Sequence, residues 1–425
     1  MRLQFAVALA ISIAWAHAAA AQEPAAVSSP LLSPTSTLTP AEAVAHALKS
    51  APRAAAAAAR LRAAEGGVAQ AGVWPNPEFG VEIENFQGTG AFRGIDSVEA
   101  TFGLSQTIEL GGKRGARIGA AEAARTAAGY DLSITQLQLI RDVRTAFTEA
   151  VAAESAVRLA EEQVRLAQEV ERSVRARVDA GREPLVQQNR AEIALRQAEL
   201  ALERARRRTT VARQELSSLS ALDVAGQQLD SSWFDRTDLP APPPEAMPDT
   251  ALTLSRRQAD VLRSRAELEL ERSRAVPDLT VSAGIRHFRE TDDNAFLVGL
   301  SIPIPIYDRN RGAIERAGAE FVAAEADLAA ARRELYTEIR AARARLAAAQ
   351  ANAGGLRATI LPKAEQAFSF AQEGYRQGKF SYLDVLDAQR TLFAARSELI
   401  DALQMFHDTR AELDRLTGTP PEGKS

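Results

Sequence analysis

The chain has 425 residues, a formal net charge of −4 and no cysteine, so disulfides and Cys-based metal sites are excluded. Charged residues make up 25% of the chain and both signs are interspersed, which is not the pattern of a nucleic-acid-binding protein. Aromatic residues reach only 5% and alanine supplies much of the apolar 46%, which favours long, closely packed helices.

Residues 1–21 have the pattern of a secretory signal peptide. Arg2 supplies the positive charge, Leu3 to Trp15 form a short apolar run, and Ala19-Ala20-Ala21 matches a small-residue cleavage site. The apolar run is shorter than the roughly 20 residues needed to span a bilayer, and no later run reaches that length. Residues 22–38, rich in Pro, Ser and Thr, are expected to form an extended tether.

The first structural unit is expected over 39–222 and begins with a helix. Thr39-Pro40-Ala41-Glu42 has the spacing of a helix start with a capping box, and Pro52 marks a break in the Ala-rich pattern that follows. Trp74-Pro75-Asn76-Pro77 ends this helical region because proline cannot continue a helix. Apolar and polar residues then alternate over about 78–109, which predicts a β-hairpin with one apolar and one polar face.

A long helical hairpin is predicted next, at about 113–222. Its first helix contains no proline up to about Val178, and at a rise of about 1.5 Å per residue it would be on the order of 90 Å long. The pattern breaks at Gly181 and Pro184 before a second helix begins. A rod of this length cannot be the core of a globular domain and must pack along neighbouring helices.

The same order of elements recurs in 250–418, after a Pro- and Asp-rich linker at 223–249. A hairpin is predicted at about 278–307, with one alternating strand reaching Ile306, and a long helical hairpin at about 312–418 with a break at Gly354-Gly355 and Pro362. Residues 419–425 form a tail. The last helix has a seven-residue apolar stripe: Val385, Leu392, Leu399, Phe406 and Leu413.

Two pairs of glycines fix the register of this repetition. Gly115 and Gly312 are separated by the same number of positions as Gly181 and Gly378. Because these glycines also occupy matching places in the order of elements, the chain is predicted to be an internal duplication.

Two hairpins give four strands, which are too few to close a barrel. Alternating strands of about 10 residues in an exported protein are typical of membrane β-barrels, so closure requires other copies of the chain. Two copies would give eight strands and three would give twelve, and the pattern does not choose between them. The alternative is a soluble periplasmic coiled-coil adaptor or scaffold protein without a membrane barrel.

The chain resembles the TolC-like outer-membrane factors over nearly all of its mature length. The resemblance lies in the duplicated order of elements, the Trp74 to Pro77 entry to the first hairpin, the Gly111 to Gly115 exit from it, and the run Tyr375, Gly378 and Asp384-Val385-Leu386-Asp387-Ala388. It implies a mainly α-helical homotrimer with a 12-stranded β-barrel in outer-membrane lipid, continued by a coiled-coil α-barrel in the periplasm. It also implies a passive efflux conduit that works with a periplasmic adaptor protein and an inner-membrane resistance-nodulation-division pump.

Within that family, Ile108-Glu109-Leu110-Gly111-Gly112-Lys113-Arg114 most resembles the branch that serves cobalt, zinc and cadmium or copper and silver efflux. The resemblance therefore implies heavy-metal resistance. A strand-to-helix turn also favours Gly-Gly for steric reasons, which is the structural alternative for this motif.

No catalytic or metal-ligating constellation is present in the sequence. His17 lies in the signal segment, and His46, His287 and His407 are far apart without metal-binding spacing, so they are expected to be surface or barrel residues. The sequence therefore predicts no enzyme activity, no cofactor and no resident metal.

Asp384 and Asp387 are the candidate functional side chains. Their spacing puts both carboxylates on one helix face, and in a trimer they would form two stacked rings that favour cations and raise each other's pKa. Ser381 gives Asp384 capping-box spacing, so helix capping is the structural alternative for that residue. The matching positions of the first repeat are Gln187 and Arg190, so only one repeat has the acidic pair.

The resemblance assigns further roles around the same turn. It implies that Asp384 and Asp387 line the periplasmic constriction and that Tyr375 helps to hold it closed. Phe380 stands where the family pattern has an arginine, and Lys379 is adjacent to that position. The two hairpin tips are the expected adaptor contacts, with a plain turn as the alternative; their residues are Gly181, Arg182, Gly378 and Phe380.

Overall fold

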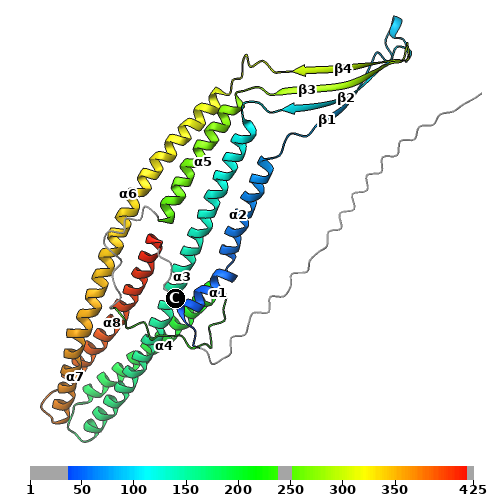
Figure 1. The fold of residues 1–425 in the computed structure, drawn as a ribbon. Helices are drawn as coiled ribbons and strands as arrows, with labels where there is room; N and C mark the ends of the chain where they lie inside the picture. Colours follow the sequence, from blue (N-terminus) through cyan, green and yellow to red (C-terminus); the bar gives the residue numbers. More distant parts are fainter. Residues whose placement is uncertain (1–36, 238–250, 419–425) are drawn as a thin grey trace, which may run out of the picture.

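A computed structural model of the protein describes residues 37–237 and 251–418. The expected signal peptide and the C-terminal tail lie outside the described residues, as do most of the tether and part of the linker. The molecule is elongated, with long helices packed side by side and a sheet extending from one end (Figure 1).

The first repeat has the predicted order of elements. The capping box at Thr39 is formed, because its hydroxyl accepts a 3.3 Å hydrogen bond from the Glu42 N–H while the Glu42 carboxylate accepts from the Thr39 N–H. The elements are α1 (Pro40–Ser50), α2 (Pro52–Ala71), β1 (Glu78–Glu84), β2 (Glu99–Ile108), α3 (Lys113–Asp179) and α4 (Leu185–Ser220).

The second repeat follows the same order, with one interruption in its long helix. A π-helical turn (Leu356–Ile360) separates α6 from α7 at the predicted break, where Pro362 has no N–H to donate to the helix. The elements are α5 (Leu252–Arg274), β3 (Leu279–Phe288), β4 (Asp293–Ser301), α6 (Arg311–Gly355), α7 (Leu361–Arg376) and α8 (Tyr382–Thr417).

The predicted extent of the last strand was wrong. Alternation continues to Ile306, but β4 ends at Ser301. Pro303 and Pro305 have no N–H, so a ladder cannot continue through them. Ile304 and Ile306 therefore lie outside the sheet with exposed fractions of 80% and 64%.

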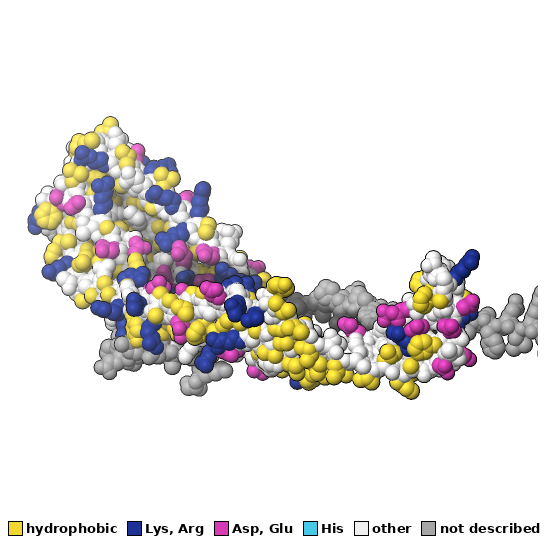
Figure 2. Space-filling model, turned by 90° about the horizontal axis from the view of Figure 1, so that it is seen from above, with side chains coloured by type: hydrophobic (Ala, Val, Ile, Leu, Met, Phe, Trp, Pro, Cys, Tyr) yellow, Lys and Arg dark blue, Asp and Glu magenta, His cyan; other side chains and the backbone are white. Residues whose placement is uncertain are grey.

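The four strands form one antiparallel sheet in the order β1-β2-β3-β4. Its apolar face is exposed, and Figure 2 shows a band of hydrophobic side chains between the helical body and the far end of the sheet. The edges of β1 and β4 pair with no described strand. Within the described ranges, no helix is both long and apolar enough to cross a bilayer. The exposed apolar side chains of the sheet include Phe79, Val81, Ile83, Phe102, Leu104, Val298 and Leu300.

The largest apolar core lies in the middle of the helical body. There, α1, α3, α4 and α8 pack around Phe147, and residues 224–234 cover them. Leu38, at the end of the predicted tether, donates to the Gln228 carbonyl at 2.8 Å. The predicted stripe of α8 is confirmed, since its members are buried apart from the half-buried Leu399.

His407 is part of this core, so of its two predicted placements, surface or barrel, the surface placement was wrong. Its Nε2 lies 2.8 Å from the Phe234 carbonyl oxygen and its ring is 4.6 Å from the Trp233 ring. Burial lowers the pKa of His407. Sequence spacing could not predict this burial because Phe234 and Trp233 are contributed by the linker.

Asp408 is the most strongly perturbed carboxyl in the described part of the chain. Burial between α3 and α8 raises its pKa from 3.8 to about 7, and nearby Glu149 adds to this, opposed by Gln404 and Arg141. One of its carboxylate oxygens is buried without a hydrogen-bond partner.

The pKa of Asp408 is higher in the folded protein than in the unfolded chain. Asp408 therefore contributes its full stabilisation below its unfolded pKa of about 4, and this stabilisation is lost as the pH rises to about 7. We expect Asp408→Asn to remove a pH dependence of about 1.4 kcal/mol per pKa unit and to raise the melting temperature at pH 8. Thermal unfolding in detergent between pH 4 and pH 8 measures this. The exposed Asp401→Asn on the same helix is the control, and equal behaviour of the two variants would contradict the prediction.

Candidate functional site

The two hairpin tips are built by the same backbone motif. The tips lie together at the end of the body away from the sheet (Figure 1). Gly181 and Gly378 have φ of 68° and 70°, the left-handed conformation that closes a helix with a Schellman motif. The Arg182 and Lys379 N–H groups each donate at 2.8 Å to a carbonyl five residues earlier, those of Arg177 and Gly374. In both repeats, the glycine therefore has a structural role: it ends the helix at the tip.

The Phe380 side chain is partly packed against the second tip. Its ring lies over Gly374, and a Cβ at that glycine would overlap the ring. The exposed fraction of Phe380 is 49%, so about half of the side chain remains available at the surface. Lys379 is exposed next to Phe380 in the chain, and Arg182 is exposed on the other tip.

Tyr375 points into the helix packing. Its ring is buried among Val170, Val174 and Val385, 6.3 Å from the ring of Tyr382. Burial raises the pKa of the Tyr375 hydroxyl, which has no hydrogen-bond partner in the structure. In the single chain this residue therefore packs α7 against α3 and α8.

Arg177 joins the two tips, a contact that the sequence did not reveal. Its Nη2 donates to the Tyr375 carbonyl at 2.9 Å and to the Arg376 carbonyl at 3.3 Å. Its guanidinium carbon is 4.2 Å from the centroid of the Tyr375 ring. A cation at the carboxyl end of a helix is favourable, and so is a cation over an aromatic face. A basic residue in the last turn of α3 was the only sequence signal, and it does not specify a partner in α7.

The two candidate carboxylates have different surroundings. Asp384 accepts hydrogen bonds from the Ser381 N–H at 2.8 Å and the Ser381 hydroxyl at 2.7 Å, which completes a capping box. The Ser381 hydroxyl is the main reason that the pKa of Asp384 is lowered in the single chain. Asp387 lies one turn later and is exposed, and no described side chain bonds its carboxylate.

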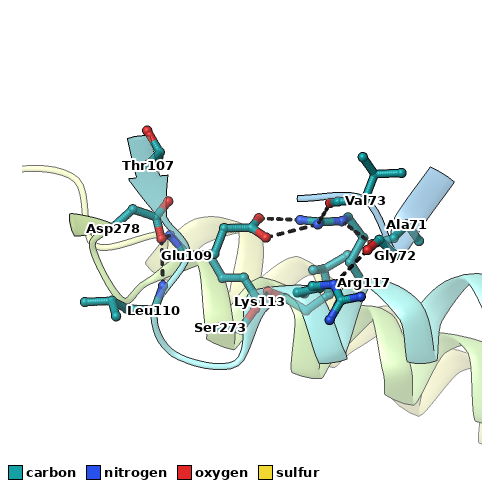
Figure 3. A network of polar contacts seen from close by, with 12 residues as sticks. Ala71, Gly72, Val73, Thr107, Glu109, Leu110, Lys113, Arg117, Ser273 and Asp278 are labelled. Carbon is teal, nitrogen blue, oxygen red and sulfur yellow. Dashed lines mark hydrogen bonds and ion pairs between the residues drawn. The ribbon is translucent and has the colours of Figure 1, made fainter. Parts of the chain in front are cut away.

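A second polar network joins the sheet to the helices (Figure 3). Arg117 forms a two-pronged ion pair with Glu109 and donates to the Ala71 carbonyl at 2.9 Å and to the Val73 carbonyl at 3.1 Å. The hydrogen bond with Glu109 raises the pKa of the Arg117 guanidinium. Arg117 therefore ties the end of α2 to the start of α3.

The glycines of the metal-branch motif fit the same junction sterically. Gly111 and Gly112 have φ of 70° and 74°, and a Cβ at Gly111 would overlap Val276. Asp278 accepts from the Leu110 N–H at 3.1 Å and from Lys113 Nζ at 2.7 Å. These contacts are all within the chain, which supports the structural alternative for the motif.

The described residues contain no group of three or more His, Asp or Glu side chains placed to hold a metal ion. The carboxylates that the structure does bring together are mostly paired with arginine, as in Arg396 with Glu162 and Glu365.

Comparisons with known proteins agree with this architecture. The family model described as outer membrane efflux protein matches residues 43–221 and 249–419. The chain is 35% identical to the cobalt-zinc-cadmium resistance protein CzcC of Cupriavidus metallidurans, covering 85% of this chain and 86% of that protein. It is 32% identical to the nickel and cobalt resistance protein CnrC of the same organism, covering 68% of this chain and 69% of that protein.

Solved structures share the fold. The outer-membrane channel OprN is 20% identical and has a TM-score of 0.77, covering 90% of each chain. The outer membrane protein VceC of Vibrio cholerae is 19% identical and has a TM-score of 0.74, covering 89% of this chain and 96% of that one.

We expect Arg117→Ala to lower stability by about 1.5–3 kcal/mol, because Glu109 and two helix-end carbonyls lose a charged donor. Thermal unfolding in detergent, followed by circular dichroism, measures the effect. Arg125→Ala is the matched control, because Arg125 is 57% exposed and its ion pair with Glu65 is long, at 3.7 Å, and therefore weak. Equal losses in the two variants would contradict a specific role for the junction.

Proposed function

Because the chain belongs to the outer membrane efflux protein family, we propose that it is the outer-membrane conduit of a tripartite system that exports heavy-metal cations. The family match sets aside the soluble scaffold alternative. The relatives named for cobalt, zinc, cadmium and nickel resistance support the metal cargo. We further propose that the chain has no catalytic activity and needs no cofactor, because a passive conduit is driven by its partners.

The observation that carries the proposal is the separation of two kinds of surface. The exposed apolar face of the sheet suits lipid, and the mixed-charge helices suit water. The 67-residue α3 runs from the sheet to the hairpin tips, on the order of 100 Å at about 1.5 Å per residue. One end of the molecule can therefore lie in the outer membrane while the tips reach into the periplasm.

The proposed assembly is a homotrimer in which three four-stranded sheets form a 12-stranded barrel above a coiled-coil α-barrel. Each chain contributes two repeats, 39–222 and 250–418, joined by 223–249. Each repeat contributes one β-hairpin to the sheet and one Schellman motif at its helical tip, which supports this division. The proposed partners at the periplasmic end are an adaptor protein and a resistance-nodulation-division pump.

We assign the periplasmic constriction to Asp384, Asp387, Tyr375 and Lys379. Asp387 is the stronger assignment because its carboxylate is exposed and unused by the fold, whereas Asp384 also caps α8. Tyr375 contributes by packing the end of α7 with Arg177. The adaptor surface is assigned to the exposed tips, with Gly181, Arg182, Gly378 and Phe380 at their turns.

Metal export is tested in a strain that lacks its own conduit but retains the matching pump and adaptor. Expression of this chain should restore growth in zinc, cobalt or cadmium. Arg117→Ala should restore less, in proportion to the protein that assembles. Normal outer-membrane trimers that restore drug tolerance but no metal tolerance would contradict the metal cargo.

The constriction is tested by separating its two carboxylates. We expect Asp387→Ala to increase by about tenfold the trivalent cation concentration needed for half block of single channels, because a ring of negative charge is lost. Asp384→Ala should in addition lower the melting temperature, because it removes the cap of α8. The control is Gln187→Ala, because Gln187 is the first-repeat residue that matches Asp384. Unchanged block in Asp387→Ala would remove that residue from the constriction.

A further inference from the structure

The long helix of the second repeat changes its winding where the linker crosses it. α6 ends at Gly355, the π-helical turn covers Leu356–Ile360, and α7 continues the same rod toward the second tip. We propose that residues 230–237, which we call the strap, hold α6 and α7 in line across a hinge at residues 354–360. When the strap is released, α7 tilts about this hinge and moves the second tip.

The hinge begins with two glycines that no contact in the described part of the chain requires. Gly354 and Gly355 lie at the end of α6, and Gly355 has an ordinary helical φ of −64°. A Cβ at either position would meet no atom within 4 Å. Glycine inside a helix allows more backbone freedom than alanine and weakens the helix. The glycine pair therefore makes this part of the rod easier to bend.

The segment that follows the glycines is also suited to bending. A π-helical turn is rare and often lies at a functional site, and Pro362 at the start of α7 has no N–H to donate to the preceding turn. Sharp helix kinks occur at prolines, at glycine or serine pairs and at π-helical turns. All three features lie within residues 354–362, so sequence and backbone place the hinge at the same point.

The strap bonds to both sides of the glycine pair. Gln350, about one turn before the glycines, donates from Nε2 to the Thr237 carbonyl at 2.7 Å. Arg357, in the π-helical turn, donates from Nη1 to the Asp235 carbonyl at 2.8 Å, and its Nη2 lies 3.4 Å from Asp235 Oδ1. Because both side chains reach the strap, the strap bridges the hinge along one face of the rod.

The strap is itself anchored in the central core. The Phe234 carbonyl oxygen lies 2.8 Å from His407 Nε2 on α8, and the Trp233 ring packs edge-on against the His407 ring. The Trp233 ring also lies 6.2 Å from the Phe147 ring of α3. Because α3 and α8 hold the strap in place, the strap can restrain the hinge.

Covering the core is the alternative role for the strap. Trp233 and Phe234 cover the core, but the two side chains of the bond at the hinge remain largely in solvent. The Arg357 side chain is 44% exposed and the Asp235 side chain is 78% exposed. Their contact therefore buries little apolar surface, and its main effect is to fix the position of the π-helical turn.

α7 is restrained at its two ends by different contacts. Among the described residues, the strap forms no hydrogen bond or ion pair with α7 itself, and the far end of α7 is held by Arg177 at the Tyr375 carbonyl. α7 has 16 residues and is about 24 Å long, so a tilt of about 10° would move its far end by about 4 Å. Tyr375 is assigned to the constriction, so the link from hinge to constriction rests on the proposed function.

Two paired variants test the strap and the hinge separately. Gln350→Ala with Arg357→Ala releases the strap, and Gly354→Ala with Gly355→Ala stiffens the hinge, where a methyl group fits. Backbone hydrogen exchange is measured on the full chain in detergent, in peptides that cover 350–376. We expect strap release to speed exchange roughly tenfold, because a charged hydrogen bond and a neutral one are lost. In the stiffened chain, most of this acceleration should disappear.

Arg345→Ala is the matched control, because Arg345 lies on α6 and donates to the Ala341 carbonyl of its own helix at 3.3 Å. Gln350→Ala alone is the milder release variant and should give a smaller acceleration at an unchanged melting temperature. Equal exchange in the control and in both release variants would overturn the strap. Full acceleration in the stiffened chain would overturn the hinge.

Single-channel conductance tests the link to the constriction. Strap release should raise the conductance, and stiffening of the hinge should abolish the increase. Faster exchange at an unchanged conductance would overturn the link between hinge and constriction. Absence of any channel activity in the unmodified protein would instead count against the proposed function, while the exchange experiment would still decide for or against the strap.

Discussion

Backbone hydrogen bonding in a medium without water is the constraint on which this architecture depends. The exposed apolar face places the sheet in lipid, where an open strand edge cannot be satisfied by solvent. Four strands in one chain leave two such edges, so the fold is incomplete without further copies. The long helices have a related requirement. α3 and α4 pack on each other, their buried residues include small ones such as Ala167 and Ala198, and the pair needs further neighbours to form a tube.

Local sequence signals predicted most of the fold. Capping at Thr39, strand alternation, the glycine breaks and the heptad stripe of α8 act through near neighbours or through a repeating period, and they can be read without coordinates. The end of β4 was predicted wrongly because alternation of side chains was given more weight than the missing N–H groups of Pro303 and Pro305. Burial of His407 could not be predicted, because it depends on linker aromatics that are distant in sequence.

The candidate site shows the same division between local and distant effects. The capping role of Asp384 could be read from Ser381, three residues away, and the structure contains that cap. The contact of Arg177 with Tyr375 joins different repeats and had no local signal. The Gly-Gly motif that resembles the metal-efflux branch forms a structural joint, so its presence describes how sheet and helix connect and does not identify a cargo.

Arg177 and Gly374 occupy equivalent positions in the Schellman motifs of the two tips, yet one is a long cation and the other has no side chain. The arginine reaches the opposite tip, and the glycine leaves space for Phe380. At the tips, the two halves of the chain are therefore complementary and not interchangeable. A chain assembled from two copies of the first half would carry an arginine at the position of Gly374 and a glutamate at the position of Phe380, so it would lose the aromatic packing of the second tip.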